Sequence, residues 1–285
     1  MENKKAKNLG GLGAKPSREK TKEKEKMGKR VISRRAEYNY GNYKEIAVFP
    51  VYSGSGRRYR EEKRAVSRKA QKELNRKNRI KKIFRLLNGN FSHKDYFLTL
   101  TYDKKSVPKD VTQAQKDYRE FIRALRRLYS AQNKPLKYMA WIEKGVEKGR
   151  LHHHLVISGG VSREKIEDLF KKGFADCKRL RPKNDDLMGL AEYFAKDPKG
   201  KRTFTCSKNL DRTCLMPVVR DNCVAKHKIK KIIENYEDKE MFERMYPGYE
   251  LIRCETRLNE YSRAVSVEII LRKKGCYGYN TYLSD

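Results

Sequence analysis

The sequence predicts an α+β domain in which helices pack on an antiparallel sheet, and three observations support this fold class. Short runs of β-branched and aromatic residues alternate with longer amphipathic segments along the middle of the chain. Two of these runs, at 136–145 and 149–160, are joined by a short stretch that contains glycine, which is typical of a hairpin. The resulting order of strand, helix, strand, strand, helix, strand and helix describes helices on one or both faces of an antiparallel sheet.

The N-terminal part of the chain is strongly basic. Residues 1–36 contain 13 Lys or Arg and 4 Asp or Glu, a net charge of +9, and almost nothing apolar to bury. We therefore expect a basic, largely disordered tail over 1–56. Residues 57–91 are predicted to form a basic amphipathic helix, because apolar residues, Leu74 among them, recur at mostly helical spacing. This helix is expected to end near Asn88-Gly89-Asn90.

The central region, 92–208, is expected to hold the sheet. The run DYFLTLTYD is rich in β-branched and aromatic residues and predicts a buried strand. Ser162 is suited to begin a helix, and Asp197-Pro198 is suited to end one. The predicted elements are strands at 96–102, 136–145, 149–160 and 174–180, and helices at 112–129, 162–170 and 185–196.

The last part of the chain, 209–285, is a C-terminal extension without recognisable chemistry. We predict a basic helix over 226–249 and two strands at 249–258 and 266–274. These elements either complete the central sheet or form a small accessory module.

The charge of the chain predicts its partner. The sequence has 69 Lys and Arg against 36 Asp and Glu, a formal net charge of +33, which attracts the protein to nucleic acids. A ribosome-associated protein and a merely solvated basic surface are the alternatives. The chain has neither an apolar run of about 20 residues nor the apolar core of a secretory signal. We therefore expect a soluble protein of the cytoplasm of a bacterial cell.

Three of the five histidines lie in one predicted strand, LHHHLVI. Side chains alternate across a sheet, so His152 and His154 should share one face while His153 points to the other. If the hairpin turns near 146–147, the preceding strand brings Glu143 close to the outer pair. Two neutral imidazoles and a carboxylate leave open positions on a divalent ion for a phosphate oxygen and water. For an isolated HHH, a surface cluster or a fortuitous chelator is the alternative.

A tyrosine and a lysine, Tyr193 and Lys196, lie at i and i+3 of the predicted helix LAEYFAKD and so share one face. A phenol with a pKa of about 10 is a poor nucleophile at neutral pH, and a nearby cation favours the phenolate. Lys196 either supplies that cation or holds a phosphate. Taken alone, the YxxK pattern indicates an ordinary amphipathic helix, and the paired histidines upstream change that interpretation.

These motifs resemble, in type and in order, those of rolling-circle replication initiators of the His-hydrophobic-His (HUH) endonuclease superfamily. They are FLTLTYD at 97–103, GRLHHHLV at 149–156 and YFAK at 193–196. The resemblance spans 84–208 and is closest to phage- and plasmid-type initiators of Gram-positive bacteria, in which a helix ending like LLNGNF precedes the first motif. The middle position of the second motif, normally hydrophobic, is His153 here, and strand alternation favours the outer pair as ligands. The resemblance implies an RRM-like palm with the paired-histidine strand at its centre.

What the resemblance implies is a site-specific single-stranded DNA endonuclease and strand transferase. His152, His154 and Glu143 would hold Mg²⁺ or Mn²⁺, and Tyr193 would attack a phosphate at a replication origin. The products would be a 5′-phosphotyrosine and a 3′-hydroxyl that primes a host DNA polymerase. No second tyrosine lies one helical turn away, which implies the single-tyrosine class. No GxxxxGK[ST] motif occurs, so a host helicase or supercoiling would open the duplex.

Three other functions share this chemistry or this charge. A relaxase also pairs histidines with a tyrosine, but generally places the tyrosine first. An HUH single-strand transposase has the same order of motifs in a chain that tends to be shorter. A non-enzymatic basic nucleic-acid-binding protein would use these residues structurally, although no strand has the aromatic pattern of an RNA-recognition sheet.

Overall fold

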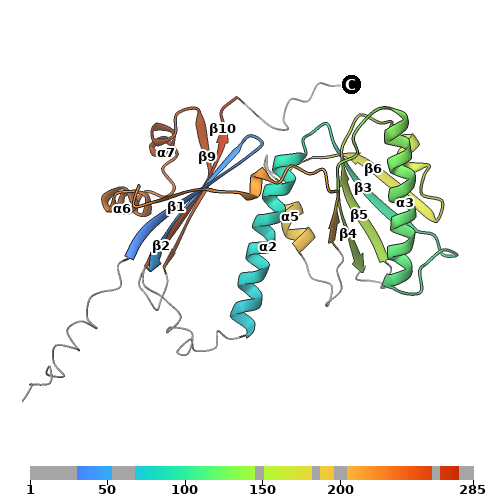
Figure 1. The fold of residues 1–285 in the computed structure, drawn as a ribbon, viewed down its shortest axis with the longest axis horizontal. Coiled ribbons are helices and arrows are strands. Elements are labelled where there is room, and N and C mark those ends of the chain that lie inside the picture. The colour runs from blue at the N-terminus through green and yellow to red at the C-terminus, as the bar shows by residue number, and fades with distance from the viewer. Residues whose placement is uncertain are drawn as a thin grey trace, which may run out of the picture.

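The computed structural model describes residues 31–52, 68–144, 151–181, 187–195, 204–258 and 264–275. It confirms the α+β class, with two antiparallel five-stranded sheets and helices that pack on them. The two sheets lie on opposite sides of the molecule, and the helix α2 (Arg68–Asn90) stands between them (Figure 1). Within the described ranges, no helix combines the length and the apolar character needed to cross a membrane.

The first sheet has the strand order β6-β3-β5-β4-β7. Its strands are β3 (Tyr96–Tyr102), β4 (Tyr138–Lys144), β5 (Leu151–Ile157), β6 (Gly173–Arg179) and β7 (Phe204–Cys206). The strand with the paired histidines, β5, is the central one, as predicted. It is antiparallel to both neighbours, with Glu143 of β4 opposite His152 and Thr99 of β3 opposite His154.

One face of this sheet is covered by the helix α3 (Val111–Ala131), which was predicted over 112–129. The side chain of Asp110 caps its first turn by accepting a hydrogen bond from the backbone N–H of Gln113. Apolar residues at helical spacing, including Phe121, Ile122 and Leu125, are buried against Leu98 and Leu155 of the sheet. The short helix α4 (Arg163–Glu167) begins at Ser162 as predicted and contacts β6 at the edge of the sheet.

The other face of the first sheet packs against α5 (Met188–Ala195) and the C-terminal half of α2. Phe84 and Leu87 of α2 are buried in one cluster with Ala191 and Phe194 of α5 and Trp141 of β4. The helix that carries Tyr193 is therefore held between α2 and the sheet, which fixes where its tyrosine can lie.

The helix α2 consists of two unlike halves. It ends at Asn90 as predicted, and its C-terminal half contributes Ile80, Ile83 and Leu86 to the core. All residues from 71 to 79 are exposed. Leu74 is 49% exposed, so its predicted place in a buried stripe was wrong, because no described element packs against this half of the helix. The exposed half carries four basic residues and one acidic residue.

A second sheet, with the strand order β8-β1-β2-β10-β9, corrects the expected N-terminal tail. Within the predicted tail of residues 1–56, β1 (Val31–Tyr40) and β2 (Tyr43–Tyr52) form a hairpin rather than disordered chain. Gly41 makes the turn with a φ of +53°, and a Cβ at this position would collide with the carbonyl oxygen of Asn88. The tip of the hairpin therefore sits against the end of α2.

A charged contact also fixes the second sheet to α2. The guanidinium of Arg85 donates two hydrogen bonds to the carboxylate of Glu45 on β2, with the Nε–Oε2 pair 2.8 Å apart. It also lies over the ring of Tyr38, 3.4 Å from its centroid. Glu45 is buried, so this bidentate pair satisfies a carboxylate that would otherwise be costly to desolvate.

The C-terminal extension does not complete the first sheet. Its strands β8 (Val218–Asp221), β9 (Tyr249–Leu258) and β10 (Val265–Lys273) pair with the N-terminal hairpin or with one another. The single helix expected over 226–249 is two helices, α6 (Lys226–Glu234) and α7 (Lys239–Met245). The break follows from Asp238, whose side chain caps α7 by accepting a hydrogen bond from the N–H of Met241. Phe242 and Ile232 bury both helices against the second sheet.

Candidate active site

The central strand presents two imidazoles on the face that α5 covers. The Nδ1 atom of His154 shares a hydrogen bond of 3.2 Å with the hydroxyl of Thr99, and Nδ1 of His152 shares one of 3.2 Å with Thr101. Both threonines belong to β3, directly opposite the histidines. With Nδ1 engaged in each ring, Nε2 is the atom left for the site. A threonine hydroxyl can donate or accept, so it supports either tautomer of its histidine.

Three predicted site residues from three elements meet at His154. One carboxylate oxygen of Glu143, on β4, lies 3.1 Å from Nε2 of His154. The hydroxyl of Tyr193, on α5, donates a hydrogen bond to the same oxygen and lies 3.3 Å from the same Nε2. His152 lies alongside, with its ring centroid 6.3 Å from that of His154. The remaining predicted residue, Lys196, lies outside the described residues.

Two aromatic rings hold the imidazole of His154 in place. The indole of Trp141 stacks on it with centroids 5.0 Å apart, and the ring of Phe97 stacks on it at 5.9 Å. Trp141 also meets the ring of Tyr193 edge-on at 5.5 Å. Neither these rings nor the two threonines were singled out from the sequence. The signal was nevertheless present, because residues 97, 99 and 101 of β3 alternate onto the same face as the histidine pair.

Burial determines the charge of His154. Desolvation and the neighbouring His152 lower the pKa of His154 to about 4. The imidazole is therefore neutral at neutral pH and can offer a lone pair at Nε2. A neutral imidazole beside a carboxylate is a donor set that binds divalent ions such as Mg²⁺ and Mn²⁺.

The donor set therefore fits a divalent metal in its chemistry, although its members do not converge on one point. Across the described ranges, no group of three or more His, Cys, Asp and Glu side chains has the spacing of a metal centre. Glu143 instead contacts His154 and the phenol of Tyr193. An incoming cation would thus compete with the tyrosine hydroxyl for the Glu143 carboxylate.

His153 points to the opposite face of the sheet, as strand alternation predicted. It is fully buried, its Nε2 lies 2.7 Å from the hydroxyl of Tyr102, and its ring stacks on Tyr118 at 5.7 Å. Burial lowers the pKa of His153 to about 4, so the ring is neutral. These contacts place His153 in the core between the sheet and α3, away from the face that carries Tyr193.

We expect His153→Ala to destabilise the fold by about 2–4 kcal/mol, because it leaves a cavity and removes the partner of the Tyr102 hydroxyl. The folded fraction should keep much of any activity at the opposite face. Urea denaturation measures the loss, with exposed His227→Ala as the control. Unchanged stability would mean that this histidine is not the core residue described here.

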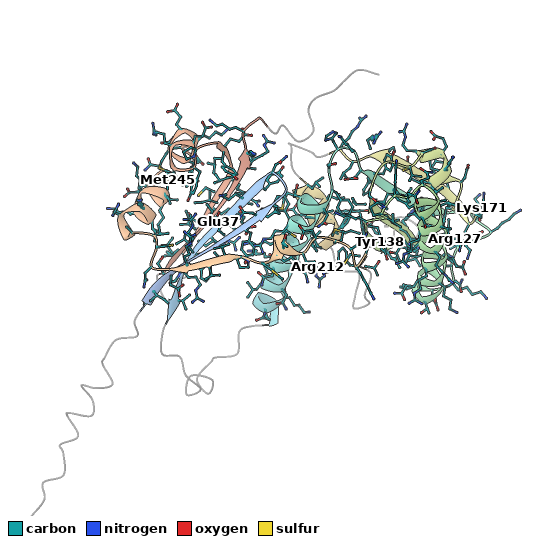
Figure 2. All side chains as sticks on the ribbon, turned by 45° about the horizontal axis from the view of Figure 1, so that its top comes forward. Glu37, Arg127, Tyr138, Lys171, Arg212 and Met245 are labelled. Atoms are coloured by element: carbon teal, nitrogen blue, oxygen red, sulfur yellow. The ribbon has the colours of Figure 1, made fainter. Side chains whose placement is uncertain are left out.

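Exposed cations surround the first sheet. The outer side of α3 carries exposed Arg119, Arg123 and Arg127, and exposed Lys171 follows α4. Figure 2 shows Arg127 and Lys171 at the end of the molecule away from the second sheet. The basic character predicted from composition is thus distributed over the surface of this sheet as well as over α2.

Comparison with known proteins matches one segment of the chain to a family. Residues 95–198 match the family model of a replication-associated protein, the ORF2 type. The segment runs from β3 to just beyond α5, so it includes Glu143, both outer histidines and Tyr193. The match supports a role as a replication initiator that acts on DNA. No curated protein and no solved structure matches the chain.

Proposed function

We propose that this chain is a rolling-circle replication initiator that nicks and rejoins single-stranded DNA with Tyr193 as its nucleophile. The observation that carries the proposal is the meeting of the Tyr193 hydroxyl with Glu143 and His154. These side chains come from one helix and two neighbouring strands, inside the segment that matches the replication-associated family. The order of histidines before tyrosine and the single tyrosine on α5 agree with the single-tyrosine class of the HUH superfamily.

The reaction is a transesterification that needs no external energy source. The phenolic oxygen of Tyr193 bonds to the scissile phosphorus, and the bond from phosphorus to the 3′-oxygen breaks. The phenolic proton passes to the Glu143 carboxylate, which already accepts its hydrogen bond, and the departing 3′-oxygen takes up a proton. The protein is left with a 5′-phosphotyrosine and the DNA with a free 3′-hydroxyl. The reverse reaction rejoins the strands.

Mg²⁺ or Mn²⁺ would be held by His152, His154 and Glu143. When bound, the ion stabilises the negative charge that develops on the phosphate. A carboxylate has two oxygens, so metal binding and proton acceptance by Glu143 are compatible. The threonines of β3 would keep each imidazole turned with Nε2 toward the ion.

The partners follow from the products. A free 3′-hydroxyl is a primer, so a host DNA polymerase would extend it and a host helicase would open the duplex. The exposed half of α2 and the net charge of +33 would hold DNA through its phosphates. A role for Lys196 in activating the phenol or in holding a phosphate belongs to the same proposal.

A covalent-capture experiment tests the proposed function. The full chain is incubated with a library of random single-stranded oligonucleotides and Mn²⁺, and the DNA that stays attached after denaturation is sequenced. We expect attached strands that share one sequence at their 5′ ends, since a site-specific nick fixes that end. If no strand stays attached under any metal condition, the protein is a DNA-binding protein and not a nickase.

A further inference from the structure

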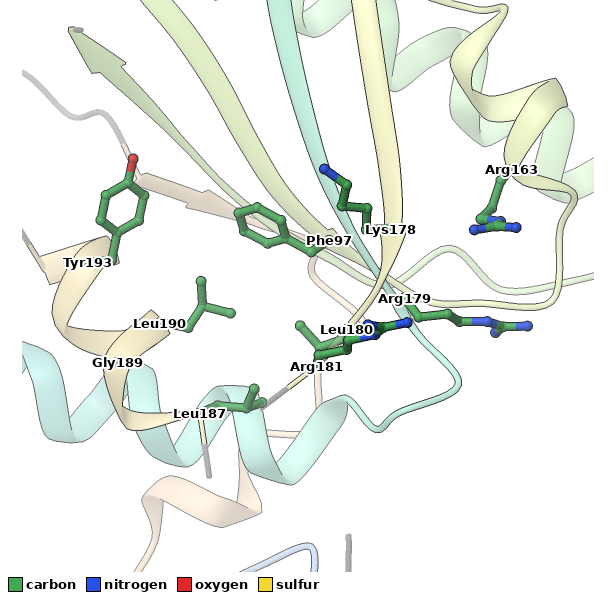
Figure 3. A pocket seen from close by; sticks show the side chains of 10 residues that line it. All are labelled: Phe97, Arg163, Lys178, Arg179, Leu180, Arg181, Leu187, Gly189, Leu190 and Tyr193. Carbon is green, nitrogen blue, oxygen red and sulfur yellow. The ribbon is translucent and has the colours of Figure 1, made fainter. Parts of the chain in front are cut away.

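A cavity opens beside the nucleophile, between β3, the end of β6 and α5. It has a volume of about 640 Å³, within the range of about 300–1,000 Å³ that is common for small-ligand sites. Tyr193 lines one side of it, and Phe97, which stacks on His154, lines another. In Figure 3 the ring of Phe97 lies between Tyr193 and Lys178. The cavity is thus continuous with the site described above.

The walls of this cavity combine apolar surface with positive charge. Leu180, Leu187 and Leu190 join Phe97 in the apolar wall, and Leu180 and Leu187 are themselves buried. The basic residues of the lining are Arg163, Lys178, Arg179 and Arg181. Within the described ranges, neither Arg163 nor Arg181 forms an ion pair with a carboxylate, whereas Lys178 pairs with Asp176 at 2.5 Å. Among the residues that the structure describes, no acidic one lines the cavity.

This combination matches a nucleotide. A flat apolar base stacks on an aromatic ring and packs against leucines, while the phosphates on either side of it need cations. A base that remains paired in a duplex is unable to enter such a cavity, whereas an unpaired base can. Because a phosphate must reach the Tyr193 hydroxyl, the neighbouring nucleotide passes directly by the opening.

We propose that this cavity binds one unpaired base of the nucleotide next to the scissile phosphate, with Phe97 as its stacking platform. Lys178, Arg181 and Arg163 contact the flanking phosphates. The inference deepens the proposed function, on which it rests for the position of the phosphate. It also supplies a physical reason for a preference for single-stranded over double-stranded DNA.

Gly189 allows the cavity to be filled without disturbing the fold. It lines the cavity from the first turn of α5, and a Cβ added there would meet no described atom within 4 Å. Gly189→Leu therefore projects a side chain into open space, and Gly189→Ala is the matched control that adds only a methyl group. Both substitutions favour the helix over glycine, so the thermal unfolding midpoint should not fall.

Binding is measured in EDTA, so that it does not depend on metal or on cleavage. The probes are two fluorescent 12-residue strands, one with abasic sites throughout and one with a single central thymidine. The native chain and Gly189→Ala should bind the thymidine strand about tenfold more tightly than the abasic strand. Gly189→Leu should lose this preference and keep its affinity for the abasic strand. Arg181→Ala should weaken binding of both strands and lower the salt dependence.

Two results would overturn the proposal. One is a native chain that binds both strands equally, which would mean that no base is held. The other is a preference that survives in Gly189→Leu, which would place the base elsewhere. Because no cleavage occurs in EDTA, a protein without nicking activity could still show the preference, so failure of the proposed function is detected separately by covalent capture.

Discussion

Replacing Tyr193 with phenylalanine should abolish the covalent protein–DNA adduct. The substitution removes only the hydroxyl, which is the group that attacks the phosphate in the proposed reaction, and we expect nicking to fall by at least about 10⁴-fold. Phenylalanine retains the ring that meets Trp141 edge-on, so the helix should keep its position. The Kd for single-stranded DNA should change by less than about threefold, because phosphate contacts dominate the affinity. The measurements are denaturing gels for the adduct and fluorescence anisotropy for binding.

The matched control is Tyr236→Phe, which removes the hydroxyl of an exposed tyrosine between α6 and α7. This variant should form the adduct at the native rate. Undiminished adduct formation by Tyr193→Phe would mean that another residue carries the chemistry. Loss of both adduct and binding would instead indicate that the tyrosine holds the site together.

The second large effect is expected at the paired histidines. His154→Ala removes the imidazole that meets both Glu143 and Tyr193, and His152→Ala removes the other proposed ligand. Each should lower metal-dependent nicking by about 10²–10³-fold, since the charge on the phosphate then loses much of its stabilisation. EDTA should abolish nicking by the native chain, and Mn²⁺ should restore it. Single-turnover nicking at several Mn²⁺ concentrations measures the effect.

His227→Ala is the control for these variants, because His227 is exposed on α6 in the second-sheet part of the molecule. It should nick at the native rate. Equal losses for His152→Ala, His153→Ala and His154→Ala in folded protein would contradict the assignment of the two outer histidines. Nicking that persists in EDTA would contradict the metal dependence.

Strand periodicity explains why much of the site could be predicted from the sequence. Alternation along β5 separates His153 from its two neighbours, and the structure places it in the opposite core, against Tyr102 and Tyr118. A short hairpin also places Glu143 opposite His152. Both facts depend on local geometry alone, so a single sequence contains them.

The contacts that orient these groups depend on distant parts of the chain. The partners of the two imidazoles are Thr99 and Thr101, and only the register of β3 against β5 reveals them. The position of α5 depends on α2, which lies about a hundred residues earlier in the chain. Neither relation leaves a local pattern in the sequence.

The second sheet was missed for a different reason. High charge at the N-terminus suggested a tail, whereas Tyr40-Gly41-Asn42-Tyr43 is a two-residue turn between alternating strands. Those strands are stabilised by pairing with β8 and β10 near the other end of the chain, as between Val48 and Val267. The hairpin signal was present in the sequence, but its burial depends on these distant strands.

The central claim is that Tyr193 becomes covalently bonded to DNA. The most direct test is mass spectrometry of the native chain after covalent capture, nuclease treatment and proteolysis. The account predicts one peptide that contains Tyr193 and carries a nucleotide through a phosphodiester on the tyrosine oxygen. A nucleotide on any other residue, or adduct-free protein after verified cleavage of the DNA, would contradict it.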